Sequence, residues 1–138
     1  MRLAIATTTS PVNIAALMRS AIGSDWKYTF QIIEDVSTAP RKKPHPQVSL
    51  QTLQRMGLDA ADYLAFEDSA NGLRAAGRAG LSTIMTRNGF TAHHDFTGPL
   101  RVLPSLEGAT VADLRGLACG GRALSRHAPN PLRSPLLN

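Results

Sequence analysis

Short apolar runs alternate with segments whose apolar residues recur at helical spacing. The runs lie at 3–6, 30–33, 63–66 and 81–85, and runs this short are typical of buried strands. After each of the first three runs, apolar residues recur at helical spacing. These segments begin after Ser10, Pro46 and Ser69, which suit the beginning of a helix, and each segment ends at a glycine. This order predicts an α/β fold with a parallel sheet joined by right-handed crossovers.

The last part of the chain has a different character. Residues 102–106 form an apolar segment that we expect to dock on the sheet. From Arg115 onward there are four arginines and no acidic residue, and these account for most of the net charge of +5. Paired glycines and three later prolines also lie in this region. We therefore expect a folded domain at 1–108 and a basic, disordered tail at 109–138.

Composition narrows the function classes. The chain has 138 residues, enough for one modest core, and its single cysteine excludes an internal disulfide and fits a reducing compartment. No apolar run approaches the roughly 20 residues that span a bilayer, and the N-terminal apolar run is too short for a signal peptide. No basic stripe is interleaved with aromatic residues, as single-stranded nucleic acid would require. We expect a cytoplasmic protein that binds neither membrane nor nucleic acid.

Polar residues follow two of the predicted strands. Thr7, Thr8, Thr9 and Ser10 come after the first strand and form either a capped loop or a set of hydroxyl donors for a phosphate at a helix N-terminus.

Glu67 and Asp68 end the third strand, where open α/β sheets place their ligands. Two adjacent carboxylates in a half-buried crevice repel each other and favour a hard cation, of which Mg²⁺ is the natural choice. The alternative is that Asp68 serves only the beginning of the next helix.

A basic loop precedes the second helix. Pro44 and Pro46 flank His45 and force an extended backbone, so Lys43 is carried on a stiff segment. Lys43 is either a cation held in position for a ligand or an ordinary solvated lysine.

The sequence His93-His94-Asp95 also contains possible metal ligands, but adjacent residues on an extended chain point apart, which favours a surface loop.

Three stretches together resemble a known family. Residues 3–10 (LAIATTTS), 42–46 (KKPHP) and 66–72 (FEDSANG) resemble, in order and spacing, the second, third and fourth motifs of the haloacid dehalogenase-like (HAD) hydrolases. The closer likeness is to the branch of β-phosphoglucomutase and the CbbY-type sugar-phosphate phosphatases, which residues 88–90 (NGF) and 94–98 (HDFTG) also resemble. The resemblance covers about residues 1–108.

The resemblance implies a three-layer Rossmann-like core and a Mg²⁺-dependent phosphatase acting on a sugar phosphate. It implies that Thr7, with Thr8 beside it, binds a phosphoryl oxygen, and that Lys43 neutralises the phosphate. Asp68 then matches a Mg²⁺ ligand, and Glu67 assists the metal site. A phosphoryl group in transfer needs such positive charge and oriented donors.

One motif of the family is missing. Its first strand carries an Asp-x-Asp pair that supplies the nucleophile and the general acid or base, and no two aspartates of this chain are separated by one residue. The cap domain is missing too. The chain therefore resembles the C-terminal portion of such an enzyme, and we expect it to be inactive alone. Without the missing strand, the strands ending near Thr7 and Asp68 must pair directly or leave unpaired edges.

Two other functions remain open. The chain could be a non-catalytic phosphate-binding remnant or a regulatory protein, which an in-frame stop codon upstream of Met1 would favour over a truncated enzyme. The arginine-containing tail could instead bind an acidic partner, which deletion of the tail would test.

Overall fold

The structure, a computed structural model, describes residues 1–89 and 98–125, which fall into two units divided after residue 105. The first unit contains β1 (Ala4–Ala6), α1 (Pro11–Ile22), β2 (Ile32–Glu34), α2 (Gln47–Met56), β3 (Leu64–Glu67), α3 (Ala70–Arg78), β4 (Ser82–Thr86) and β5 (Arg101–Leu103). Two short 3₁₀ helices, η1 (Trp26–Thr29) and η2 (Ala60–Asp62), lie before β2 and β3. The predicted alternation of strands and helices is confirmed.

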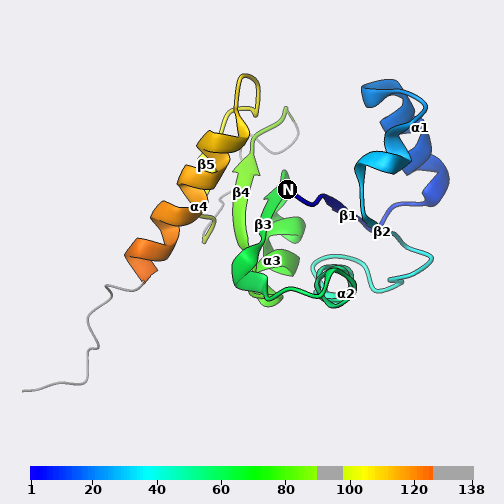
Figure 1. Ribbon diagram of the computed structural model, residues 1–138. Coiled ribbons are helices and arrows are strands. Elements are labelled where there is room, and N and C mark those ends of the chain that lie inside the picture. The colour runs from blue at the N-terminus through cyan, green and yellow to red at the C-terminus, as the bar shows by residue number, and fades with distance from the viewer. Residues whose placement is uncertain (90–97, 126–138) are drawn as a thin grey trace, which may run out of the picture. The chain divides into compact units, whose positions relative to one another are not determined.

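The described strands are all parallel, but they form two sheets rather than one. β1 pairs with β2, with Ile5 opposite Ile33, and β4 lies between β3 and β5, with Ile84 opposite Phe66. Figure 1 shows β3 beside β4, with β1 and β2 apart from them. Among the described strands β1 and β3 do not pair, and each has one edge without a partner strand, which is the second of the two expected outcomes.

The three predicted helices begin where the sequence predicts, and α1 and α2 end at the predicted glycines, whereas α3 ends at Arg78 with Ala79 as its cap. Pro11 takes the first position of α1, and Ser10 Oγ accepts a hydrogen bond from Asn13 N at 3.3 Å. Ser69 caps α3 in the same way. Gly57 ends α2 in the left-handed region, with φ of 68°, a conformation that a residue without Cβ adopts at little cost.

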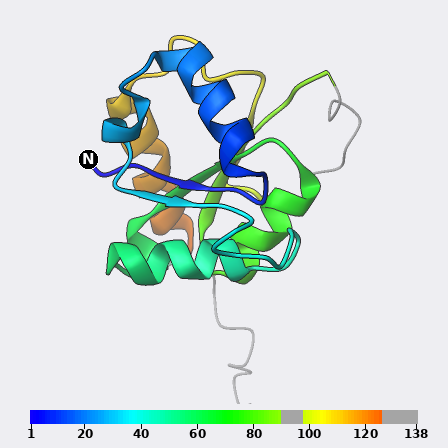
Figure 2. The same ribbon diagram turned by 90° about the vertical axis from the view of Figure 1, so that its right-hand side faces the viewer.

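Helices cover both sides of the first sheet. Figure 2 shows α2 on one side of β1 and α1 on the other. α2 also contacts α3, which packs against β3 and β4. The most completely buried large side chains of the core include Ile84 and Met85 on β4. The layered α/β architecture is therefore confirmed.

The C-terminal part differs from expectation in two places. Part of the apolar segment expected to dock on the sheet forms a strand of it, β5. The segment expected to be a disordered tail contains α4 (Val111–Ser125). Its first turn explains this, because Thr110 N donates to Asp113 Oδ2 at 2.9 Å and Asp113 N donates to Thr110 Oγ1 at 3.2 Å. This reciprocal pair satisfies amides that would otherwise lack partners.

None of the described helices is long and apolar enough to cross a membrane. The candidates His93-His94-Asp95, Phe90 and most of the segment at 94–98 lie outside the described residues.

Candidate functional site

Lys43 and Glu67 meet at the carboxyl end of β3. Lys43 Nζ lies 2.5 Å from Glu67 Oε1, and the side chains are 16% and 14% exposed. A hydrogen bond between two charged groups in such a sheltered place is stronger than one between neutral groups. The structure thus brings together two of the predicted site residues, which come from distant parts of the chain.

The loop that carries Lys43 is fixed by contacts on both sides. His45 N donates to the carbonyl of Lys42 at 3.0 Å, and Gln47 N donates to His45 Nδ1 at 3.1 Å. From α3, Arg78 Nη1 donates to the carbonyl of Pro44 at 3.0 Å. These bonds restrict the backbone on which the ammonium group is carried, so less conformational entropy is lost when it binds an anion.

Gly72 makes room for Glu67. A Cβ at residue 72 would collide with Glu67 Oε2, so this carboxylate lies directly against the first turn of α3. A helix N-terminus favours negative charge there. The glycine is a site residue that the sequence analysis missed, although its place three residues after the cap Ser69 was a usable signal.

Asp68 lies at the same strand end and is exposed. Its Oδ2 accepts a hydrogen bond from Asn88 Nδ2 at 3.0 Å. Asn88 follows β4, the strand next to β3, so the rule that ligands gather at carboxyl ends of parallel strands could have identified it.

Thr7 and Thr8 follow β1 and are half-buried. Thr7 Oγ1 accepts a hydrogen bond from Thr9 N at 3.3 Å, as in a capped loop. Among the described contacts, none joins Thr7 or Thr8 to Lys43, Glu67 or Asp68. The two strand ends do open on a common cavity, because Ala6 and Glu67 both line it.

The described residues that could bind a metal are carboxylates at the carboxyl end of β3. The described part of the chain contains no group of three or more His, Cys, Asp or Glu side chains that could hold a metal ion. Mg²⁺ often takes one or two protein carboxylates and completes its shell with water and substrate phosphate. Asp68 fits the role of such a single ligand, whereas Glu67 is engaged by Lys43.

The Glu67 carboxyl has a raised pKa. Burial raises the pKa of its carboxyl above the ordinary value, the negative charge of Asp68 adds to this, and Lys43 opposes both. Glu67 therefore takes up a proton more readily in the folded chain than in the unfolded chain. Its contribution to stability is full below the ordinary glutamate pKa of about 4.3 and is lost as the pH rises through the raised value.

We expect Glu67→Gln to change the pH dependence of stability with this sign. The free energy of unfolding of the wild type, minus that of the variant, should fall as the pH rises from about 4 toward neutrality. Urea unfolding at a series of pH values measures it. The hydrogen bond from Ser37 lowers the pKa of Asp35, so Asp35 changes stability with pH in the opposite direction. Both proteins contain Asp35, so its effect cancels in the difference between them. A difference that stays constant over this range would contradict the expected burial of the charge.

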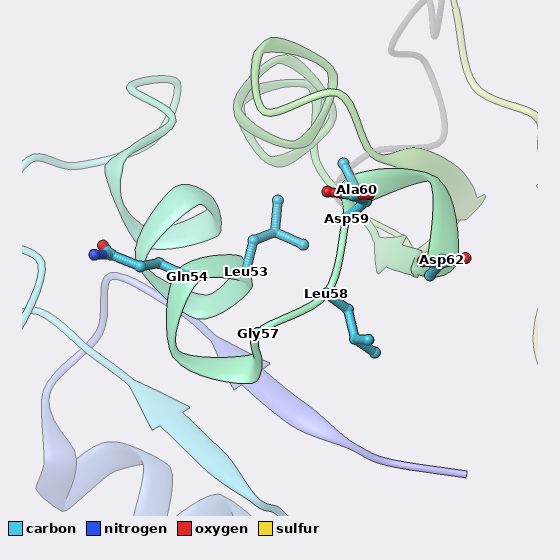
Figure 3. A pocket seen from close by; sticks show the side chains of 7 residues that line it. All are labelled: Leu53, Gln54, Gly57, Leu58, Asp59, Ala60 and Asp62. Carbon is cyan, nitrogen blue, oxygen red and sulfur yellow. The ribbon is translucent and has the colours of Figure 1, made fainter.

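A second, open depression lies near the amino end of β3. It has a volume of about 480 Å³ and is lined by Leu53, Gln54, Gly57, Leu58, Asp59, Ala60 and Asp62. Figure 3 shows the side chains of Gln54 and Asp62 pointing away from one another. None of the predicted site residues lines this depression, so the carboxyl end of β3 is the candidate site.

The chain matches the model of a known protein family, and the related proteins that it matches are longer than the chain itself. A model of the haloacid dehalogenase-like hydrolases matches residues 1–80. The plasmid-encoded CbbY protein of Cupriavidus necator is 52% identical over 104 residues, which are 75% of this chain and 41% of that protein. The chain spans about half the length, or less, of the curated relatives it matches.

Two solved structures of CbbY from Rhodobacter sphaeroides share the fold. One, in complex with phosphate, matches with a TM-score of 0.78 at 37% identity, over 83% of this chain and 52% of that one. The other, a mutant in complex with xylulose-(1,5)bisphosphate, matches with a TM-score of 0.77 at 38% identity, over 82% and 51%.

Proposed function

Because the chain belongs to the haloacid dehalogenase-like hydrolases, we propose that it forms the phosphate-binding portion of a Mg²⁺-dependent sugar-phosphate phosphatase. The observation that carries this proposal is the contact of Lys43 Nζ with Glu67 Oε1 at the carboxyl end of β3. It fixes a cation beside Asp68, at the strand end where an anionic substrate and its metal would be held.

The proposed roles follow from the chemistry of each side chain. Lys43 supplies positive charge to a phosphate, and its short bond to Glu67 positions the ammonium group. Thr7 and Thr8 supply hydroxyl donors at the end of β1, next to the cavity that Ala6 and Glu67 line. These donors and the cation would stabilise negative charge on the phosphoryl oxygens.

Mg²⁺ would be held by Asp68, with Glu67 acting through Lys43 rather than as a ligand. When bound, this ion would neutralise charge on the phosphoryl group. Asn88, whose amide holds Asp68 Oδ2, positions the carboxylate. The sugar phosphate bound to the Rhodobacter sphaeroides relative, xylulose-(1,5)bisphosphate, indicates the class of ligand to test.

A second function, a non-catalytic phosphate-binding protein, is favoured by one specific observation. The sequence contains no Asp-x-Asp pair to supply a nucleophile. In both proposals the chain binds phosphate, and in both the chain alone lacks the group that would attack phosphorus.

We expect the purified chain to bind inorganic phosphate without turning over a sugar phosphate. Calorimetric titration with phosphate should give saturable binding to one site. Release of phosphate from xylulose-(1,5)bisphosphate, with and without Mg²⁺, should stay at the rate of the protein-free control. Titration without saturation would contradict the phosphate site, and metal-dependent turnover would contradict the assignment of a missing nucleophile.

A further inference from the structure

His45 closes the turn that carries Lys43 and is itself half-buried. Its backbone N donates to the carbonyl of Lys42 at 3.0 Å, so residues 42–45 form a turn with Lys43 at the second position. The contacts that hold His45 in place therefore also restrain the residue that carries the ammonium group.

The imidazole ring of His45 takes the place of a helix cap. α2 begins at Gln47, and the residue before it, Pro46, makes no side-chain cap hydrogen bond. The first amides of a helix lack partners within the helix. Gln47 N instead donates to His45 Nδ1 at 3.1 Å. The ring thus ties the turn of residues 42–45 to the beginning of α2.

Arg41 and Gln47 join the two ends of the same loop. Arg41 N donates to Gln47 Oε1 at 2.9 Å, and Arg41 Nη1 lies 3.0 Å from His45 Nε2. Both contacts connect a residue before Lys43 with a residue after it. The backbone on either side of Lys43 is therefore held in part through the His45 ring.

These contacts require the His45 ring to be neutral. A neutral imidazole accepts a hydrogen bond at one nitrogen, whereas an imidazolium donates at both nitrogens and accepts at neither. Nδ1 faces the N–H of Gln47 and Nε2 faces the guanidinium of Arg41, so protonation removes the acceptor that one of these donors uses. It also places a second positive charge beside Arg41 and at the N-terminus of α2, where positive charge is unfavourable.

The charged groups around the loop offer little to an imidazolium. Lys42 lies on the loop itself, and Arg78 reaches the loop from α3 by donating to the carbonyl of Pro44. The first turn of α2 contains no acidic residue. From β3, the Glu67 carboxylate faces the loop but is engaged by Lys43 Nζ. Protonation of His45 should therefore release the turn.

We propose that His45 is a positioning residue for Lys43 in its neutral form only, so that acid weakens the phosphate site. This inference rests on the proposed phosphate-binding function and adds a pH dependence to it. Histidine side chains ordinarily change charge between about pH 5 and 8. A released turn presents Lys43 correctly for a smaller share of the time, and the apparent affinity falls by that share.

The test measures binding of sulfate to the full 138-residue chain by calorimetric titration, because the charge of sulfate is constant over this pH range. Between about pH 8 and about pH 5.5 the wild type should lose about threefold or more affinity beyond any loss by His45→Asn. Asn is the matched control, since it keeps an acceptor for the amide two residues on and does not titrate. Glu67 and Asp68 are present in both proteins, so their protonation cancels.

His45→Ala removes the acceptor at every pH. It should bind sulfate about threefold or more weakly than His45→Asn at about pH 8, where the wild type and His45→Asn should agree. Rescue by Asn but not by Ala distinguishes the lost acceptor from the lost ring.

A second measurement needs neither an anion nor a folded variant. In the isotope-labelled wild type, the backbone amide resonances of Lys43 and Gln47 should shift with pH along the same curve as the His45 ring. The His45→Asn chain, where it folds, should lack this transition.

Three results would overturn the proposal: equal losses of affinity in the wild type and His45→Asn, a gain of affinity by the wild type in acid, or a Lys43 amide that does not follow the His45 ring. Absence of saturable sulfate binding at every pH would instead contradict the proposed phosphate site, and the amide shifts would still decide whether His45 positions Lys43.

Discussion

Lys43→Ala is expected to lower the affinity of the chain for inorganic phosphate by about 30-fold or more. Removing one partner of a sheltered, hydrogen-bonded charge pair costs about 2 kcal/mol or more, which corresponds to this factor. Lys43 is 16% exposed and lies on a loop held by Arg78, so it is preorganised to meet an anion. Calorimetric titration with phosphate at low ionic strength measures the change.

Lys42→Ala is the matched control, because Lys42 carries the same charge on the adjacent residue but is exposed. It should bind phosphate within about twofold of the wild type, since an exposed charge contributes little. Lys43→Ala also leaves the Glu67 carboxylate without its cation, which should cost about 1–3 kcal/mol of unfolding free energy. Adding Glu67→Gln should restore part of that stability but not phosphate binding. Equal affinities for the two lysine variants would contradict the assigned role.

Arg55→Ala is expected to lower the free energy of unfolding by about 1–3 kcal/mol, because Glu34 is buried but the Arg55 side chain is 51% exposed and solvent screens part of the pair. Glu34 on β2 is fully buried, and its Oε1 accepts a hydrogen bond from Arg55 Nη1 at 2.6 Å. Its Oε2 has no hydrogen-bond partner among the described residues. Removing the guanidinium leaves a buried carboxylate without a compensating charge, which is far costlier than losing a surface pair. Urea unfolding at neutral pH measures the loss.

Arg19→Ala on α1 is the control for this change, because its side chain is exposed. It should alter stability by no more than about 0.5 kcal/mol. Glu34→Met combined with Arg55→Ala should recover most of the loss, since an apolar side chain replaces the buried charge. A loss below about 0.5 kcal/mol for Arg55→Ala alone would show that Glu34 is not buried as described.

Much of the fold was predictable because its local signals are strong. Ser10 and Ser69 cap helices, and Gly57 ends one, as their side chains and φ angles dictate. The helix from 111 was missed because Gly116 and the later glycines and prolines outweighed the pair Thr110 and Asp113. The separation into two sheets could not be decided, since it depends on which strand edges meet rather than on the pattern within each strand.

The site was predictable in part. The strand-end positions of Glu67 and Asp68 identified them as candidates, and the flanking prolines identified Lys43. The sequence placed Glu67 beside Asp68 as an assistant to a metal site, which stays a prediction, and it did not indicate the contact of its carboxylate with Lys43. Such a contact depends on how α2, α3 and the loop between 41 and 46 pack, and on the space that Gly72 leaves. The spacing of residues along the chain determines neither this packing nor this space.

In the proposed site, separate segments of this chain hold one phosphate. The most direct test is to add inorganic phosphate to the isotope-labelled chain and follow its backbone amide resonances by NMR. We predict that Thr7, Thr8 and Lys43 shift together along one saturation curve. Shifts confined to the arginines from Arg115 onward, with Thr7, Thr8 and Lys43 unmoved, would contradict it.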